Sequence, residues 1–132
     1  MPRISKENYY LDIAETVLKR STCLRRCYGA IIVNNDEIIA TGYNGAPRGR
    51  INCTDAGRCA RVEMNIPSGE RYELCRSVHA EANAITKVAK SNNSSLGATL
   101  YVTASPCIEC AKLIIQAGIR RAVYSENYRS VD

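Results

Sequence analysis

The stretch TLYVTASPCIECAKLIIQAGIRRAVY, residues 99–124, decides the fold class. Its first five residues are apolar or β-branched and predict a strand over 99–103. Residues 107–117 then predict a helix, which Gly118 ends, and residues 121–124 predict a second strand. A strand–helix–strand passage of this kind places a helix against a face of the sheet that contains both strands. We therefore expect an α/β fold.

Four further elements precede this stretch, namely a helix, two strands and a second helix. A helix is expected over residues 6–20, with Ser5 as its N-cap and an apolar face formed by Tyr10, Ile13, Ala14, Val17 and Leu18. The β-branched runs 29–33 and 37–42 flank Asn and Asp residues and predict a hairpin. A second helix is expected over residues 79–90, with a shared face formed by Ala82, Ile85, Thr86 and Ala89. The whole order predicts a three-layer-type sandwich, in which helices flank a mixed sheet whose first pair is antiparallel.

Residues 43–76 differ from the rest of the chain, because they are rich in Gly, Pro, Asn and Arg and show little periodicity. A structureless loop of this length needs something to fix it inside a compact domain. At 132 residues the chain suits one domain, so we expect residues 1–132 to form a single domain that carries a Cys-bearing insert at about 43–76.

The composition restricts the class of protein. No apolar run approaches the roughly 20 residues of a membrane span, and the polar N-terminus has no signal-peptide core. We therefore expect a cytoplasmic protein, in which seven cysteines suggest metal ligation more than disulfides. The net charge of +5 suits a phosphorylated substrate or a solvated basic surface, and no polybasic run indicates nucleic-acid binding.

One His and two Cys residues form the strongest chemical motif. His79 is the single histidine, and Cys107 and Cys110 are three positions apart at the start of an expected helix. Such a set suits a catalytic zinc ion, which keeps its fourth position open. Two thiolates cancel the charge of Zn²⁺, so a nearby base is needed, and Glu81 suits that proton-transfer role. The alternative is a structural zinc site with Glu81 as an incidental acid, although structural sites usually have four protein ligands.

The chain resembles the cytidine deaminase-like superfamily in HAE at residues 79–81 and SPCIEC at 105–110. Within it, the chain is similar to the deoxycytidylate (dCMP) deaminases in further stretches, namely CLRR at 23–26, YGAIIV at 28–33, TGYNGAP at 41–47, NC at 52–53 and CRSVHAEANAI at 75–85. The resemblance implies a cytidine deaminase-like fold and zinc-dependent hydrolysis of dCMP to dUMP and ammonia, which supplies dUMP for thymidylate synthesis.

The resemblance also implies roles for individual residues. His79, Cys107 and Cys110 would bind zinc, and Glu81 would be the proton shuttle. Asn44 would hydrogen-bond the sugar or base, although its place beside a glycine also suits a simple turn. Tyr128 would pack on the nucleotide or in the core. For the phosphate, Arg25 is the first choice and Arg26 and Arg48 follow, because the Arg fork matches phosphate oxygens.

Family members are often homohexamers that dCTP activates and dTTP inhibits, so the resemblance implies a homo-oligomer with these effectors. Some members carry a second zinc ion. We hypothesise that its ligands here are Cys23, Cys53, Cys59 and Cys75, with Cys27 as a bystander. Buried or free thiols are the alternative.

Two other classes of function remain open from the sequence. The first is deamination of another base, such as free cytidine, guanine, a riboflavin precursor or adenosine in tRNA. A tRNA deaminase would be expected to show a basic face for the RNA backbone. The second is a structural zinc module that binds a partner without turnover, which would leave Glu81 and the open coordination position unexplained.

Overall fold

The computed structural model describes residues 3–22, 26–45 and 78–125. Its elements follow the predicted order, and each boundary lies within two residues of its predicted position. They are α1 (Lys6–Leu18), β1 (Gly29–Asn34), β2 (Glu37–Tyr43), α4 (Ala80–Ala89), β3 (Thr99–Val102), α5 (Ile108–Gln116) and β4 (Arg121–Tyr124). Most of the predicted insert lies outside the described residues, so the single-domain organisation stays a prediction. Across the described ranges, no helix is long and apolar enough to cross a bilayer.

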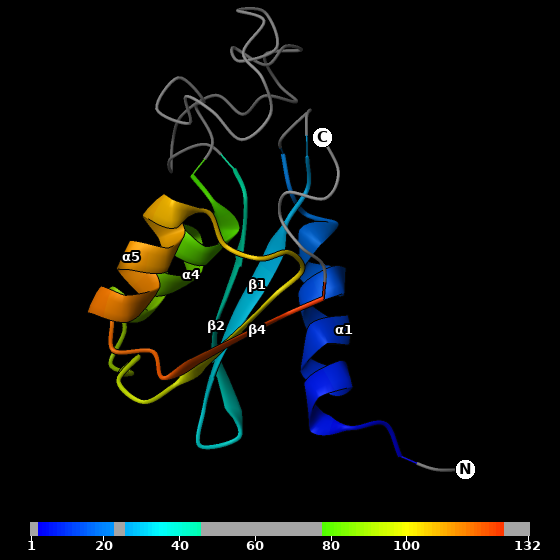
Figure 1. Ribbon diagram of the computed structural model, residues 1–132, viewed down its shortest axis with the longest axis horizontal. Helices are drawn as coiled ribbons and strands as arrows, with labels where there is room; N and C mark the ends of the chain where they lie inside the picture. Colours follow the sequence, from blue (N-terminus) through cyan, green and yellow to red (C-terminus); the bar gives the residue numbers. More distant parts are fainter. Residues whose placement is uncertain (1–2, 23–25, 46–77, 126–132) are drawn as a thin grey trace, which may run out of the picture.

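The four strands form one mixed sheet in the order β2-β1-β3-β4. The central strand β1 is antiparallel to both β2 and β3, whereas β3 and β4 are parallel. Strands β2, β3 and β4 therefore end at the same edge of the sheet, and α4 and α5 begin there (Figure 1). The α/β fold class and the mixed sheet are confirmed.

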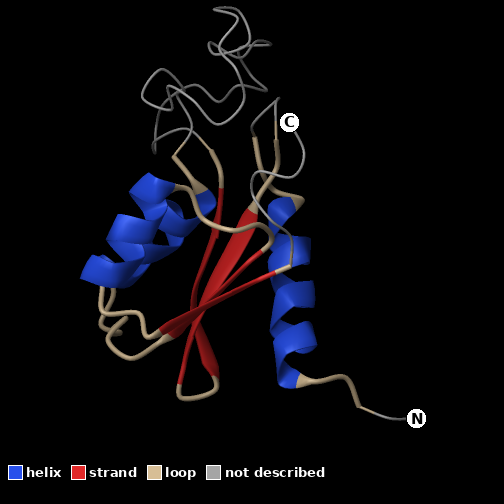
Figure 2. Ribbon diagram, in the orientation of Figure 1, coloured by secondary structure: helices blue, strands red, loops and turns tan. Residues whose placement is uncertain are grey.

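The sheet separates two apolar layers, because alternate residues of a strand face opposite sides. Ala30 and Ile32 of β1 face α4 and α5, whereas Ile31 and Val33 face α1. Figure 2 shows the resulting three layers, with α1 on one side of the sheet and the other two helices on the other. The first layer also contains Ala40, Ala80, Ala84, Val88, Ala98, Leu100, Val102, Ile114 and Ile119, and the second contains Tyr10 and Tyr101.

Local signals in the sequence set the ends of several elements. The Ser5 hydroxyl caps α1 by accepting a hydrogen bond from the Asn8 N–H, at 3.1 Å. Asn35 and Asp36 form the two-residue hairpin turn with φ values of 52° and 62°, a conformation that these residue types tolerate. Gly118, at φ 78°, follows the C-cap of α5 as predicted.

Helix α4 packs unusually close to β2 at Gly42. A Cβ atom on Gly42 would lie 2.3 Å from the Ala80 carbonyl oxygen and 2.6 Å from the Ala84 nitrogen. The face buried on α4 therefore consists of small residues and one acid, Ala80, Glu81, Ala84 and Val88. The expected face of Ala82, Ile85, Thr86 and Ala89 is not the most buried one: Ile85 packs against the core, but Thr86 and Ala89 are exposed. Close contact with Gly42 selects the alanine side of the helix instead.

Candidate metal centre

Two helix N-termini carry the three expected ligands. His79 is the N-cap residue of α4, Cys107 is the N-cap residue of α5, and Cys110 lies in the first turn of α5. Neither N-cap side chain makes a capping hydrogen bond. Both side chains instead turn toward each other at the end of the sheet where β2 and β3 finish.

The three ligand atoms have the spacing of a zinc site. The His79 Nδ1 atom lies 3.5 Å from the Cys107 Sγ atom and 3.4 Å from the Cys110 Sγ atom. The three atoms all lie within 4.8 Å of one another. Ordinary zinc bond lengths and tetrahedral angles place a nitrogen and a sulfur ligand about 3.6 Å apart. The donor set and its geometry therefore fit zinc with three protein ligands.

The two thiols have shifted pKa values in opposite directions. A hydrogen bond from the Cys110 side chain, with a weaker contribution from His79, lowers the pKa of the Cys107 thiol to about 4. The same hydrogen bond and burial raise the pKa of the Cys110 thiol. Both thiols would bind a metal ion as thiolates, because a coordinated thiol loses its proton.

Glu81 is the charged residue buried beside these ligands. It is 6% exposed, and the Cys110 side chain lies next to its carboxyl group. Burial is the main cause that raises the pKa of Glu81. A buried carboxyl group at this position can accept and return protons beside the metal centre.

Backbone links attach both halves of the centre to the sheet. On the His79 side, Val78 and Gly45 exchange two backbone hydrogen bonds, at 2.6 and 3.1 Å. On the cysteine side, the Thr103 N–H donates to the Gly29 carbonyl, and the Thr103 hydroxyl accepts from the Gly29 N–H. The cysteine segment therefore follows β3 along the chain, whereas the residue before His79 pairs with Gly45, two residues after the end of β2.

Asn44 is buried at this end of the sheet, with 4% exposure. Its side-chain oxygen accepts hydrogen bonds from the Ser21 hydroxyl and, at 2.9 Å, from the Tyr28 N–H. Its Nδ2 atom donates to the Arg26 carbonyl at 2.7 Å. Asn44 thus links the segment after α1 to the end of β2, and its expected bond to a nucleotide stays a prediction.

Several expected residues lie outside the described parts of the chain: Cys23, Arg25, Arg48, Cys53, Cys59, Cys75 and Tyr128. Their roles in phosphate binding, base packing and a second zinc site stay predictions. Arg26 is described, and its guanidinium group lies 5.3 Å from the centroid of the Tyr28 ring. Cys27, the expected bystander, is exposed.

Residues that the motif did not identify also contribute to the site. Gly42 allows α4 to approach β2, Thr103 holds the start of the cysteine segment, and the Asn83 amide donates to the Tyr43 carbonyl at 2.7 Å. In the sequence, the feature that could have identified Asn83 is its position four residues after His79, which places its amide one turn further along the same side of the helix.

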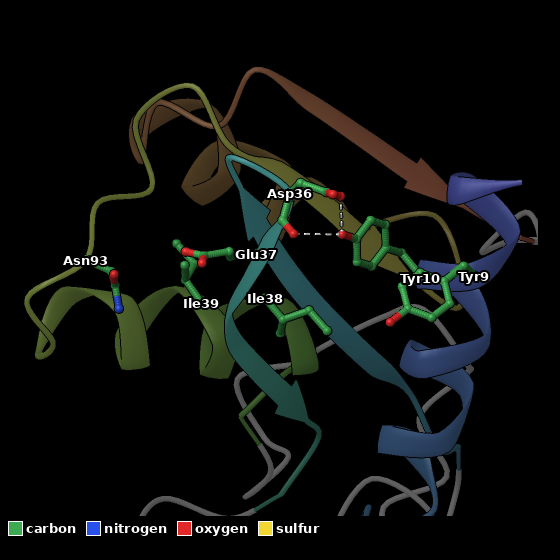
Figure 3. A pocket seen from close by; sticks show the side chains of 7 residues that line it. All are labelled: Tyr9, Tyr10, Asp36, Glu37, Ile38, Ile39 and Asn93. Carbon is green, nitrogen blue, oxygen red and sulfur yellow. Dashed lines mark hydrogen bonds between the residues drawn. The ribbon is translucent and has the colours of Figure 1, made fainter.

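A pocket of about 510 Å³ lies at the opposite, hairpin end of the sheet. Figure 3 shows Tyr10 and Asp36 within it, where the Tyr10 hydroxyl donates to the Asp36 carboxylate at 2.6 Å. This hydrogen bond and burial raise the pKa of Tyr10 to about 12. The pocket includes the turn between β1 and β2, and the metal ligands lie at the other end of these strands. The pocket therefore does not belong to the metal centre.

Comparison with known proteins relates this geometry to a family. The family described as "Cytidine and deoxycytidylate deaminase zinc-binding region" matches residues 4–126. The deoxycytidylate deaminase of Mycobacterium phage D29 is 40% identical over 94% of this chain and 97% of its own length. That of Schizosaccharomyces pombe is 36% identical over 96% of this chain, but the chain spans only 38% of that protein.

A solved structure has the same fold. It is described as the dCMP deaminase from cyanophage S-TIM5 in complex with dCMP and dUMP, and it is 35% identical, with a TM-score of 0.75. The match covers 98% of this chain and 89% of that one. The family matches nearly the whole chain, the phage relative has a similar length, and the three residues that could bind zinc lie together. The chain therefore belongs to the zinc-binding deoxycytidylate deaminase family.

Proposed function

We propose that this protein hydrolyses dCMP to dUMP and ammonia. The observation that carries the proposal is the convergence of His79, Cys107 and Cys110 on one point, with the Glu81 carboxyl group buried beside them. Relatives named deoxycytidylate deaminase and a related structure described as a complex with dCMP and dUMP support the choice of substrate.

The residues divide the reaction between them. His79, Cys107 and Cys110 would hold the zinc ion, which supplies Lewis acidity toward an attacking water molecule. Glu81 accepts a proton from that water and delivers protons to the ring nitrogen and the departing amine. Water first adds at C4 of the base as the ring nitrogen gains a proton, and the C–N bond to the protonated amine then breaks, so water and dCMP give dUMP and ammonia.

Substrate comparison tests this proposal. Zinc-loaded protein is mixed with dCMP, with deoxycytidine and with tRNA, and deamination is followed by cytosine absorbance or ammonia release. We expect kcat/KM for dCMP to exceed that for deoxycytidine by about ten- to a hundredfold, the effect of one charge-assisted hydrogen bond to the phosphate.

Equal turnover of deoxycytidine would contradict a nucleotide substrate, and turnover of tRNA without dCMP would indicate the adenosine-deaminating alternative. Folded, zinc-loaded protein that deaminates none of the three would contradict the enzyme assignment and favour a structural zinc module.

The finer features belong to the same proposal. The family resemblance supports a cytoplasmic homohexamer that feeds thymidylate synthesis, with dCTP as activator and dTTP as inhibitor. Sedimentation of the full chain, with and without each nucleotide, tests the assembly. A zinc content near two per chain would support a second site at Cys23, Cys53, Cys59 and Cys75, whereas a content near one would contradict it.

A further inference from the structure

The side chain of Asn83 connects two backbone segments at the metal end of the sheet. Its Nδ2 atom donates to the Tyr43 carbonyl at 2.7 Å and lies 3.4 Å from the Val78 carbonyl oxygen. Tyr43 is the last residue of β2, and Val78 immediately precedes His79. One amide group therefore contacts the end of a strand and the residue before a metal ligand.

Asn83 is also bound to His79 through the backbone. Its N–H donates to the His79 carbonyl at 2.9 Å, which is the first turn of α4. Because Val78 and Gly45 also exchange two hydrogen bonds, residues 43–45 and 78–79 form a closed hydrogen-bonded unit around the Asn83 amide. This unit fixes the backbone from which the imidazole projects.

The position of Asn83 on the helix separates it from the reacting groups. Residues two positions apart on an α-helix point about 200° apart, so Asn83 and Glu81 leave α4 on nearly opposite sides. Glu81 is buried next to the Cys110 side chain, whereas the Asn83 amide bonds to backbone carbonyls. Any effect of Asn83 on the metal must therefore pass through the backbone that carries His79.

Close packing makes this link stiff. Gly42 touches the backbone of Ala80 and Ala84, so β2 and α4 have no space to slide at this point. Removing the donor from a half-buried carbonyl group costs free energy, which favours the arrangement with the amide in place.

We propose that Asn83 is a positioning residue for the metal centre. By holding the Tyr43 and Val78 carbonyl groups, it sets where the His79 Nδ1 atom lies relative to the sulfur atoms of Cys107 and Cys110. The proposal concerns metal binding and does not depend on which base the protein deaminates.

The test compares two asparagines that make the same kind of bond. In the variant Asn83→Ala, the amide at the metal end is removed. In the control Asn34→Ala, the amide removed is one that donates to the Ser94 carbonyl at 3.0 Å, at the hairpin end of the sheet. For each protein, zinc affinity is measured by competition with a chelator, and the thiolate-to-cobalt absorption of the Co²⁺-loaded protein is recorded.

We expect Asn83→Ala to bind zinc about tenfold or more weakly and to shift the cobalt spectrum, as loss of groups that orient metal ligands commonly does. The control should match the wild-type protein in both. Wild-type affinity and an unchanged spectrum in Asn83→Ala would overturn the proposal, as would equal weakening in both variants.

If Asn83→Ala does not fold, Asn83→Ser is measured in the same way, because serine is too short to reach the Tyr43 carbonyl. Weaker zinc binding with a shifted cobalt spectrum by Asn83→Ser supports the proposal. Wild-type values overturn it.

Discussion

The two ends of the sheet bury their charged side chains to different extents, although the same strands form both. Among the described residues at the metal end, the side chains of Asn44, Glu81 and Thr103 are buried. At the hairpin end, the Lys6–Asp36 ion pair leaves its side chains 61% and 59% exposed. A buried polar group depends on its protein partners, whereas an exposed pair is replaced readily by water.

This difference indicates that the arrangement of side chains is held more firmly at the metal end than at the hairpin end. Losing a partner of a buried polar group costs about 1–3 kcal/mol, so the arrangement at the metal end resists distortion. Changes at that end should therefore alter metal binding, and changes at the hairpin end should stay local.

The largest effect is expected from removing a sulfur ligand. Cys110→Ser should lose one zinc ion per chain and all dCMP turnover, with zinc affinity reduced by more than about a hundredfold, the upper range seen for changes in the groups that merely support ligands. The exposed Cys27 provides the matched control. Zinc analysis of both variants checks this prediction. Loss of zinc from Cys27→Ser but not from Cys110→Ser would contradict Cys110 as a zinc ligand.

A smaller effect is expected from adding one methyl group at Gly42. The new Cβ atom would meet backbone atoms of Ala80 and Ala84, so Gly42→Ala should lower the free energy of unfolding by about 1–3 kcal/mol and weaken zinc binding.

Gly97→Ala is the control for Gly42→Ala. Gly97 has a φ of 76°, where an alanine is strained, and it lies just before β3, at the opposite end of the sheet from His79, Cys107 and Cys110. Gly97→Ala should therefore destabilise the protein with a smaller change in zinc affinity. Denaturant unfolding and chelator competition measure the two quantities, and identical zinc affinities in the two variants would refute the distinction.

The smallest effect is expected at the hairpin end. Asp36→Asn should lower the pKa of Tyr10 from about 12 toward its ordinary value of 10.0 and leave dCMP turnover at neutral pH unchanged. Because the folded state holds the phenol protonated, this stabilisation is present below pH 10 and is lost as the pH rises through about 12.

Absorbance titration of the phenolate, with Tyr10→Phe to assign the signal, measures the shift. Thermal unfolding should show the loss of stability at lower pH in Asp36→Asn than in the wild-type protein. A Tyr10 pKa that is unchanged in Asp36→Asn would show that Asp36 does not raise the pKa of Tyr10.

Much of the fold could be predicted because its signals are local. The Ser5 cap, the Asn35–Asp36 turn and the glycine after α5 each act within a few residues, so the sequence contains the whole cause. The spacing of Cys107 and Cys110 likewise places both sulfurs in one helical turn before any tertiary contact is known.

The remaining features depend on contacts between distant segments. The buried face of α4 is set by Gly42, which lies in another element, and hydrophobicity alone favoured the side with Ile85. The Asn83 amide acts on Tyr43, which is 40 residues earlier in the chain. No periodicity within one helix contains that information.

The most direct test of the whole account compares two glutamates in the metal-binding motifs. Glu81 is buried, whereas the Glu109 side chain is 74% exposed and pairs with Lys112. Zinc content and dCMP turnover are measured for Glu81→Gln and Glu109→Gln. The account predicts that both keep their zinc, that Glu81→Gln loses about 10²- to 10⁴-fold in kcat, and that Glu109→Gln behaves as wild type. Wild-type turnover by zinc-loaded Glu81→Gln would contradict it.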